Sequence, residues 1–189
     1  MTTLPMETIV LTMHDRETPV WDIITRIFHW SLVVAYCTSQ LTAEEWDTAH
    51  EYAGYIILVL VAFRIIWGFV GPQNVRFFNF VKSPSTIMTH LTNILTGQHT
   101  AEAGHNPAGG IMVVVLLSWL ALTGLTGWLS TTLSGNIAEL LEEIHELLGK
   151  FSLLLIALHV AGVIAMSLLE RQVLAKSMID GKKHLKSDF

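Results

Sequence analysis

Two histidines near the end of the chain, His145 and His159, lie fourteen residues apart with a mostly apolar sequence between them. At about 100° per residue, fourteen steps return to within roughly 40° of a whole number of turns, so both imidazoles project from nearly one face of a helix. Their separation along the helix axis is about 21 Å, which is most of the roughly 30 Å hydrocarbon core of a bilayer. A helix with this spacing is suited to hold two cofactors at two depths of a membrane.

The composition favours a membrane protein with a single domain, residues 1–189. Of its 189 residues, 51% are hydrophobic and 14% are charged, and the mean hydropathy is +0.50. The net charge of −5 argues against a nucleic-acid partner, which usually needs a basic patch. The single cysteine, Cys37, excludes a disulfide within the chain. It also excludes a Cys-x-x-Cys-His site for covalent haem and a cysteine-built zinc or iron–sulfur centre.

Four apolar segments predict membrane-spanning helices, because each approaches the roughly 20 residues that cross a bilayer. They are residues 25–41, 50–70, 111–129 and 145–169. The alternative is that they are buried helices of a soluble protein. It is disfavoured because four such helices in a chain of this length leave little polar surface to cover them. The expected fold class is therefore all-α, an integral membrane four-helix bundle.

The charges of the connecting segments predict the orientation of this bundle. The connections after the first and third predicted helices hold acidic residues and no Lys or Arg: Glu44, Glu45, Asp47, Glu139, Glu142 and Glu143. The other connection and the tail hold basic residues: Arg76, Lys82, Arg171, Lys176, Lys182, Lys183 and Lys186. Positive residues gather on the cytoplasmic side. We therefore expect a multi-pass protein of the bacterial inner membrane with both termini in the cytoplasm.

Two further segments, residues 84–96 and 170–180, are expected to form short helices on the inner membrane surface. Ser83 and Pro84 supply a helix cap and a first-turn proline for the first of them. Apolar residues then follow at helical spacing or stand among basic residues: Ile87, Leu91, Ile94 and Leu95 in the first segment, and Val173, Leu174, Met178 and Ile179 in the second. A solvated loop is the alternative for both segments.

Two more histidines match His145 and His159 in depth. With this orientation His29 enters the first helix from the inner side, and His50 opens the second helix from the outer side. The four residues then sort into an outer pair, His50 with His145, and an inner pair, His29 with His159. Two six-coordinate haems need two such pairs, with one imidazole on each side of each iron. Four unrelated histidines, each hydrogen-bonded within the bundle, would not be expected to pair by depth and face.

The second and fourth helices both carry the pattern His-Glu-x-x-Gly at their outer ends, beginning at His50 and at His145. A residue four positions after a histidine lies on the same face of the helix. Glycine at that position leaves room for a flat macrocycle, so Gly54 and Gly149 are predicted to line the outer haem. Close helix packing is an alternative role for both glycines, and the two roles are compatible.

Arg64 lies fourteen residues after His50, on the same helix face and at the inner depth. A charge inside a spanning helix costs about 2.5–3.5 kcal/mol on insertion scales and usually has a partner. A haem propionate is an anion that the guanidinium fork matches. We therefore expect Arg64 to bind the inner haem, and Arg26, one turn before His29, to do the same. Extension of either side chain to the inner headgroups is the alternative.

These features resemble the prokaryotic b-type cytochromes with four spanning helices, which include prokaryotic cytochrome b561 and the b-type subunits of nickel–iron hydrogenases and formate dehydrogenases. The resemblance covers nearly the whole chain. It is carried by residues 20–22, 25–30, 64–72 and 104–107, and by the four paired histidines with Gly54. It implies two non-covalent haems b and electron transfer across the membrane between a redox partner and the quinone pool.

With two imidazoles on each iron, neither haem has an open coordination position. The chain is then an electron-transfer protein or a quinone-linked oxidoreductase subunit rather than a self-contained enzyme. Expected partners are membrane lipid, a quinone near the inner side, and a periplasmic cytochrome c or the catalytic subunit of a dehydrogenase or hydrogenase; a homodimer is left open. The competing class is a four-helix transporter or scaffold subunit whose histidines bind a transition metal or relay protons. Such a site would gather its ligands at one depth.

Overall fold

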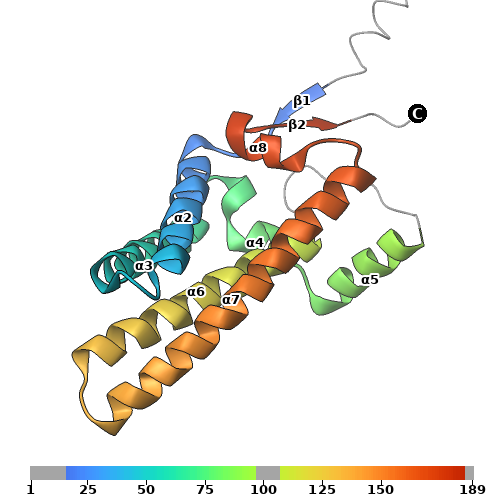
Figure 1. Ribbon diagram of the computed structural model, residues 1–189. Helices are drawn as coiled ribbons and strands as arrows, with labels where there is room; N and C mark the ends of the chain where they lie inside the picture. The colour runs from blue at the N-terminus through green and yellow to red at the C-terminus, as the bar shows by residue number, and fades with distance from the viewer. Residues whose placement is uncertain (1–15, 97–106, 186–189) are drawn as a thin grey trace, which may run out of the picture.

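The computed structural model describes residues 16–96 and 107–185, which form four long helices, several short helices and a two-stranded ribbon (Figure 1). In chain order these are β1 (Arg16–Pro19), α2 (Ile23–Thr42), α3 (Asp47–Val70), the 3₁₀ turn η1 (Gln73–Val75), α4 (Phe77–Phe80), α5 (Pro84–Leu95), α6 (Pro107–Thr132), α7 (Asn136–Leu169), α8 (Leu174–Asp180) and β2 (Lys182–Leu185). The expected all-α bundle is confirmed, and the ribbon is an addition to it.

The long helices begin and end where local chemistry requires it. Asp22 caps α2, because its carboxylate accepts hydrogen bonds from the backbone N of Thr25 at 3.0 Å and from the Thr25 hydroxyl at 2.6 Å. α3 ends at Val70 and is capped by Gly71, which is followed by Pro72, whose ring prevents the helix from continuing. Gly135 turns the chain between α6 and α7 with φ of +72°, a conformation that glycine adopts without strain.

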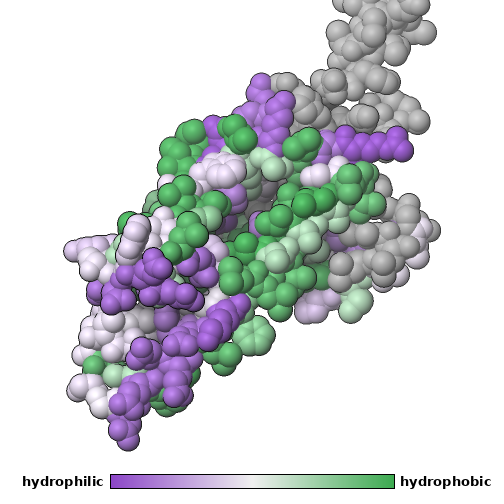
Figure 2. All heavy atoms as spheres, in the orientation of Figure 1, coloured by the Kyte–Doolittle hydropathy of each residue, from purple (hydrophilic) through white to green (hydrophobic). Residues whose placement is uncertain are grey.

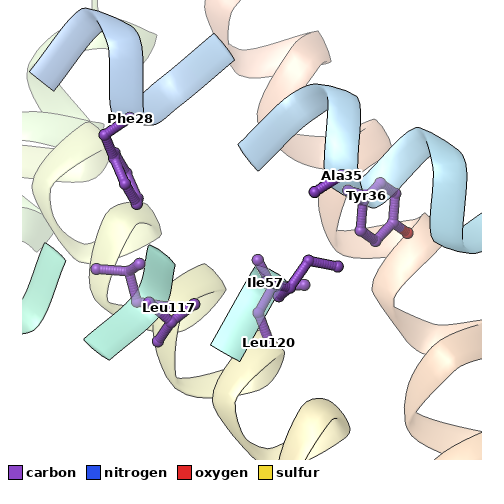
Figure 3. Close-up of a cluster of buried hydrophobic side chains, with 7 residues drawn as sticks. Phe28, Ala35, Tyr36, Ile57, Leu117 and Leu120 are labelled. Atoms are coloured by element: carbon purple, nitrogen blue, oxygen red, sulfur yellow. The ribbon is translucent and has the colours of Figure 1, made fainter. Parts of the chain in front are cut away.

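The four long helices form two hairpins that share one interface. α2 lies along α3, α6 lies along α7, and α3 packs against α6 (Figure 1). The first hairpin is α2 with α3, and the second is α6 with α7. α7 meets α2 and α3 at few positions, so a seam runs between α7 and the first hairpin. The buried hydrophobic core comes from α2, α3 and α6 (Figure 3) and consists of Phe28, Ala35, Tyr36, Ile57, Val61, Leu117 and Leu120. Ser152 is the one buried residue of α7.

Three of the described helices, α3, α6 and α7, are long and apolar enough to cross a membrane. At most 28% of any of their apolar windows is buried inside the protein. So much exposed apolar surface suits lipid rather than water. In Figure 2 apolar side chains cover the middle of the molecule, and hydrophilic ones gather toward its two ends. The protein is therefore a membrane protein.

α2 is not among these three helices, although the sequence predicts four spans. Its 20 residues are long enough, but Arg26, His29 and Gln40, together with several hydroxyl side chains, lower its mean hydropathy. Much of its apolar surface is nevertheless exposed, with Ile27 at 60% and Val34 at 65%.

α8 and the ribbon join the two ends of the described chain. β1 and β2 pair antiparallel. The Gly181 carbonyl accepts hydrogen bonds from the backbone N of Val20 at 2.8 Å and of Trp21 at 3.2 Å. The indole N–H of Trp21 donates to Ser177 Oγ at 3.1 Å, and that of Trp30 donates to a carbonyl of α8 at 3.0 Å. The predicted tail helix is therefore docked on the start of α2.

The helices differ from the predicted bounds mainly by extension at their ends. The largest extension is at α7, which begins at Asn136, nine residues before His145. The tail helix expected over residues 170–180 begins only at Leu174, because the chain turns at Arg171 with φ of +51°. α5 ends at Leu95, one residue early. Residues 104–106 of the family resemblance lie outside the described residues.

Candidate haem sites

The outer pair of histidines is brought together across the seam. The ring centroids of His50 on α3 and His145 on α7 lie 5.8 Å apart, with the ring planes at 79°. A backbone carbonyl from a neighbouring helix orients each ring. His50 Nδ1 lies 2.9 Å from the Ser39 carbonyl of α2, and His145 Nδ1 lies 2.8 Å from the Thr123 carbonyl of α6. All four long helices therefore hold this pair.

These contacts decide which ring nitrogen carries the hydrogen. A carbonyl oxygen only accepts hydrogen bonds, so Nδ1 of His50 and of His145 must each be the donor. In a neutral imidazole Nε2 then keeps a lone pair. Histidine ligands of metals commonly use this arrangement, because the Nδ1–H···O=C bond orients the ring and raises the basicity of Nε2. Both rings of the outer pair have the hydrogen-bonding pattern that this type of ligand needs.

Glycines shape the space around the outer pair. A Cβ added at Gly54 or at Gly149 would meet nothing within 4 Å, so there is open space beside each of these glycines. Sequence reasoning misses a third glycine, Gly127 on α6. A Cβ there would lie 2.8 Å from both Cε1 and Nδ1 of His145, so glycine is required for this ring orientation. Its only signal in the sequence is its position one turn after Thr123. That position indicates a role beside His145 only when α6 is known to pack against α7.

A buried polar contact joins α2 to α7 between the two histidine depths. Ser152 stands midway between His145 and His159 in sequence, and its hydroxyl lies 2.7 Å from that of Tyr36. Ser152 Oγ also donates to the Gly149 carbonyl at 2.6 Å. Since a hydroxyl has one hydrogen, Tyr36 is the donor in the contact between the two side chains. Figure 3 shows the Tyr36 hydroxyl directed toward α7.

The inner pair, His29 on α2 and His159 on α7, lies on the two sides of the same seam. The two side chains are close enough to interact electrostatically. Nδ1 of His29 is buried and has no hydrogen-bond partner within the described part of the chain. Neither ring is held by a carbonyl there, in contrast to the outer pair. The two histidine pairs therefore differ in how their rings are oriented.

Arg64, near the inner end of α3, is only 3% exposed. Its Nη2 donates to the Val75 carbonyl at 3.1 Å, and its guanidinium carbon lies 5.0 Å from the centre of the Phe77 ring. Its Nη1 is buried without a partner among the described residues. A side chain this buried does not extend to the headgroups, which disfavours that alternative.

Arg26 ties the tail to α2. Its Nη1 donates to the Ile179 carbonyl of α8, and a Cβ added at Gly181 would lie 3.3 Å from the same nitrogen. Its Nε is buried and has no partner in residues 16–96 and 107–185. The sequence predicts a role beside the inner haem, and the structure adds this docking contact, which sequence reasoning does not anticipate.

The outer histidine pair has a ring separation that suits two ligands of one haem iron. Among the described residues there is no group of three or more His, Cys, Asp or Glu side chains that could hold a metal ion. A haem iron needs only two ligands from the protein, because its macrocycle supplies four. With metal–nitrogen bonds of about 2.0 Å, two imidazoles on opposite sides of one metal have centroids roughly 6 Å apart, close to the observed 5.8 Å. The open space at Gly54 and Gly149 suits a macrocycle.

Comparison with known proteins agrees with this chemistry. The sequence profile of the prokaryotic cytochrome b561 family matches residues 20–181, a range that contains both histidine pairs and both arginines. No curated protein and no solved structure matches the chain. Because the family match covers most of the chain, the protein belongs to the prokaryotic cytochrome b561 family, membrane b-type cytochromes that transfer electrons.

Proposed function

We propose that the protein holds two haems b, one in each histidine pair, and transfers electrons across the bacterial inner membrane between a redox partner and the quinone pool. The observation that carries the proposal is the outer pair, where both Nδ1–H groups donate to carbonyls, which leaves a lone pair on each Nε2. The fourteen-residue spacing of His145 and His159 supports a second site about 21 Å deeper along α7. In this proposal α2 is the fourth spanning helix, and both termini are cytoplasmic.

A haem held by two imidazoles supplies one-electron redox chemistry and no open position for a substrate. The residues of the chain bind and orient it. The carbonyls of Ser39 and Thr123 fix the rings of the outer ligands, and Gly54 and Gly149 leave space for the macrocycle. At the inner site a guanidinium as buried as that of Arg64 suits an anionic propionate.

The two ends of the bundle suit different partners. The family resemblance favours a quinone site at the inner end, near His29, His159 and Arg64. At the outer end, the acidic residues Glu44 and Glu45 are exposed. A negatively charged outer surface attracts a basic partner, such as a periplasmic cytochrome c or the catalytic subunit of a dehydrogenase or hydrogenase.

The proposal is tested by the reduced-minus-oxidised absorption spectrum of the purified protein and by its haem content. We expect a low-spin b-type signal and two haems per chain. Changing either member of one pair to alanine should remove the same haem: His50→Ala and His145→Ala the outer one, His29→Ala and His159→Ala the inner one. His90→Ala, in α5, is the matched control and should retain both. If His145→Ala and His29→Ala removed the same haem, the pairing would be wrong.

A further inference from the structure

Four buried side-chain nitrogens at the start of α2 and the end of α3 have no hydrogen-bond partner in residues 16–96 and 107–185: Arg26 Nε, His29 Nδ1, Arg64 Nη1 and Trp67 Nε1. The arginine and tryptophan nitrogens can only donate. Buried donors nearly always have an acceptor, because an unsatisfied one lowers stability. This gathering of donors therefore indicates an acceptor group that is not one of the described residues.

Two of these donors, on Arg64 and Trp67, border the same buried residue. Val75 is fully buried, and its carbonyl accepts the hydrogen bond from Arg64 Nη2 at 3.1 Å. A Cβ added at Gly71 would lie 2.8 Å from Val75 Cγ2 and 3.1 Å from Trp67 Cε2. Cε2 is the ring carbon bonded to Nε1, so the N–H edge of the indole lies on the Gly71 and Val75 side. The guanidinium and the indole N–H, from successive turns of α3, thus both lie on the side of Val75.

Aromatic neighbours restrict both side chains. Trp67 stacks on Phe63, with ring centroids 6.0 Å apart and planes at 15°. Phe77 lies against the Arg64 guanidinium, and its ring also fills the space beside Gly68, where a Cβ would fall 2.0 Å from Phe77 Cε2. These ring contacts limit how far the guanidinium and the indole can turn.

We propose that Trp67 Nε1 and Arg64 Nη1 donate to the two oxygens of one carboxylate, and that this carboxylate is a propionate of the inner haem. The assignment rests on the proposed di-haem function and adds Trp67 to the haem-binding residues. A carboxylate has one acceptor oxygen for each donor, and its charge compensates the buried guanidinium. Since Arg64 is 3% exposed, a lipid headgroup at the surface is the poorer match.

The test compares haem with its dimethyl ester, which keeps the iron and macrocycle but cannot offer a propionate anion. Haem-free protein in detergent is reconstituted with each compound in the His50→Ala background, where only the inner site binds. We expect Trp67→Phe to weaken haem binding by about tenfold to a hundredfold, the range for a hydrogen bond to a charged group. The same change should have little effect on binding of the ester. Trp128→Phe, at a 45% exposed tryptophan of α6, is the matched control and should behave as its parent with both compounds.

Two results would overturn the assignment: equal weakening of haem and ester, which indicates a packing role, or no weakening of either. Loss of bound phospholipid from Trp67→Phe with unchanged haem affinity would also overturn it. If Trp67→Phe does not fold, Arg64→Gln should show the same ester-dependent loss, and Arg64→Lys should recover part of it. Unmodified protein that binds no haem at all contradicts the di-haem function itself. Protein that binds two haems but shows no ester-dependent loss contradicts only the role of Trp67.

Discussion

Substitution of Gly127 by alanine is the sharpest probe of the outer haem site. The added Cβ would lie 2.8 Å from Nδ1 and Cε1 of His145 and 3.4 Å from its Cγ. Separations near 2.8 Å are too short for unbonded heavy atoms, so the ring must move. The ring is held by its hydrogen bond to the Thr123 carbonyl, one turn before Gly127 on the same helix. Moving the ring therefore strains the anchor that orients Nε2.

The expected loss of haem affinity in Gly127→Ala has two contributions. Overpacking by one methyl group typically costs about 1–3 kcal/mol, and loss of the Nδ1 hydrogen bond costs about 0.5–1.5 kcal/mol. If the ring moves freely enough to relieve the clash, only part of the first contribution remains. We therefore expect a loss of about 1–3 kcal/mol in binding at the outer site, which corresponds to a roughly 5- to 150-fold higher Kd. Changes beside metal-binding histidines commonly weaken binding by about 10–100-fold.

The assay is reconstitution of the haem-free protein, followed by the low-spin absorption signal, in the His29→Ala background that leaves only the outer site. Gly124→Ala is the matched control. A Cβ there would also be crowded, at 2.7 Å from Leu58 Cδ2, but it would touch no histidine. Its haem affinity should stay within about twofold of the parent. The reasoning is refuted if Gly127→Ala binds haem as tightly as its parent, or if both variants weaken binding equally.

Three further changes probe other contacts. Gly149→Ala should change the unfolding free energy of the haem-free protein by no more than about 1 kcal/mol, but it should weaken haem binding at the outer site. Gly162→Ala, on the same helix and equally open, should not weaken haem binding at the outer site. Equal outer-site haem affinities of the two variants would contradict the role of Gly149 beside the macrocycle. Tyr36→Phe should lower the unfolding free energy by about 0.5–1.5 kcal/mol. Ser152→Ala should lower it by about 1–3 kcal/mol, because it leaves the buried Tyr36 hydroxyl without its acceptor. A larger loss for Tyr36→Phe than for Ser152→Ala, measured by denaturation in detergent, would count against Tyr36 as the donor. Trp21→Phe removes the bond to Ser177 Oγ and should speed amide hydrogen exchange in α8, and unchanged exchange would mean that this bond does not hold the tail.

The helices and the depths of the histidines could be predicted because both follow from helical period and apolar length. Fourteen residues of regular helix fix the separation of His145 and His159, and the charges of the connections predict which end of each helix faces the cytoplasm. This reasoning places His50 at the depth of His145, and the structure puts the two rings 5.8 Å apart. Such predictions need no knowledge of which helix packs on which.

Features that depend on helix pairing could not be predicted in this way. The anchors of the outer ligands are the backbone carbonyls of Ser39 and Thr123, and a backbone carbonyl has no signature in the sequence. Gly127 looks like any small residue of an apolar helix until His145 is packed against it. The ribbon joins β1 to β2 across most of the chain, and two four-residue strands are too short to show an alternating pattern. The length of α2 is that of a spanning helix, but its polar residues keep it less apolar than α3, α6 and α7.

The seam between α7 and the first hairpin also affects assembly of the protein. Each hairpin has its own interhelical packing, and beyond the α3–α6 interface the first hairpin meets α7 at few positions, among them the contact of Tyr36 with Ser152. Both histidine pairs take one member from each hairpin. A cofactor bound at either pair therefore connects the two hairpins. Its binding free energy then stabilises the closed bundle. Free haem at 100 times its Kd would add about 2.7 kcal/mol per site, so haem supply would set how much of the inserted chain reaches the closed bundle.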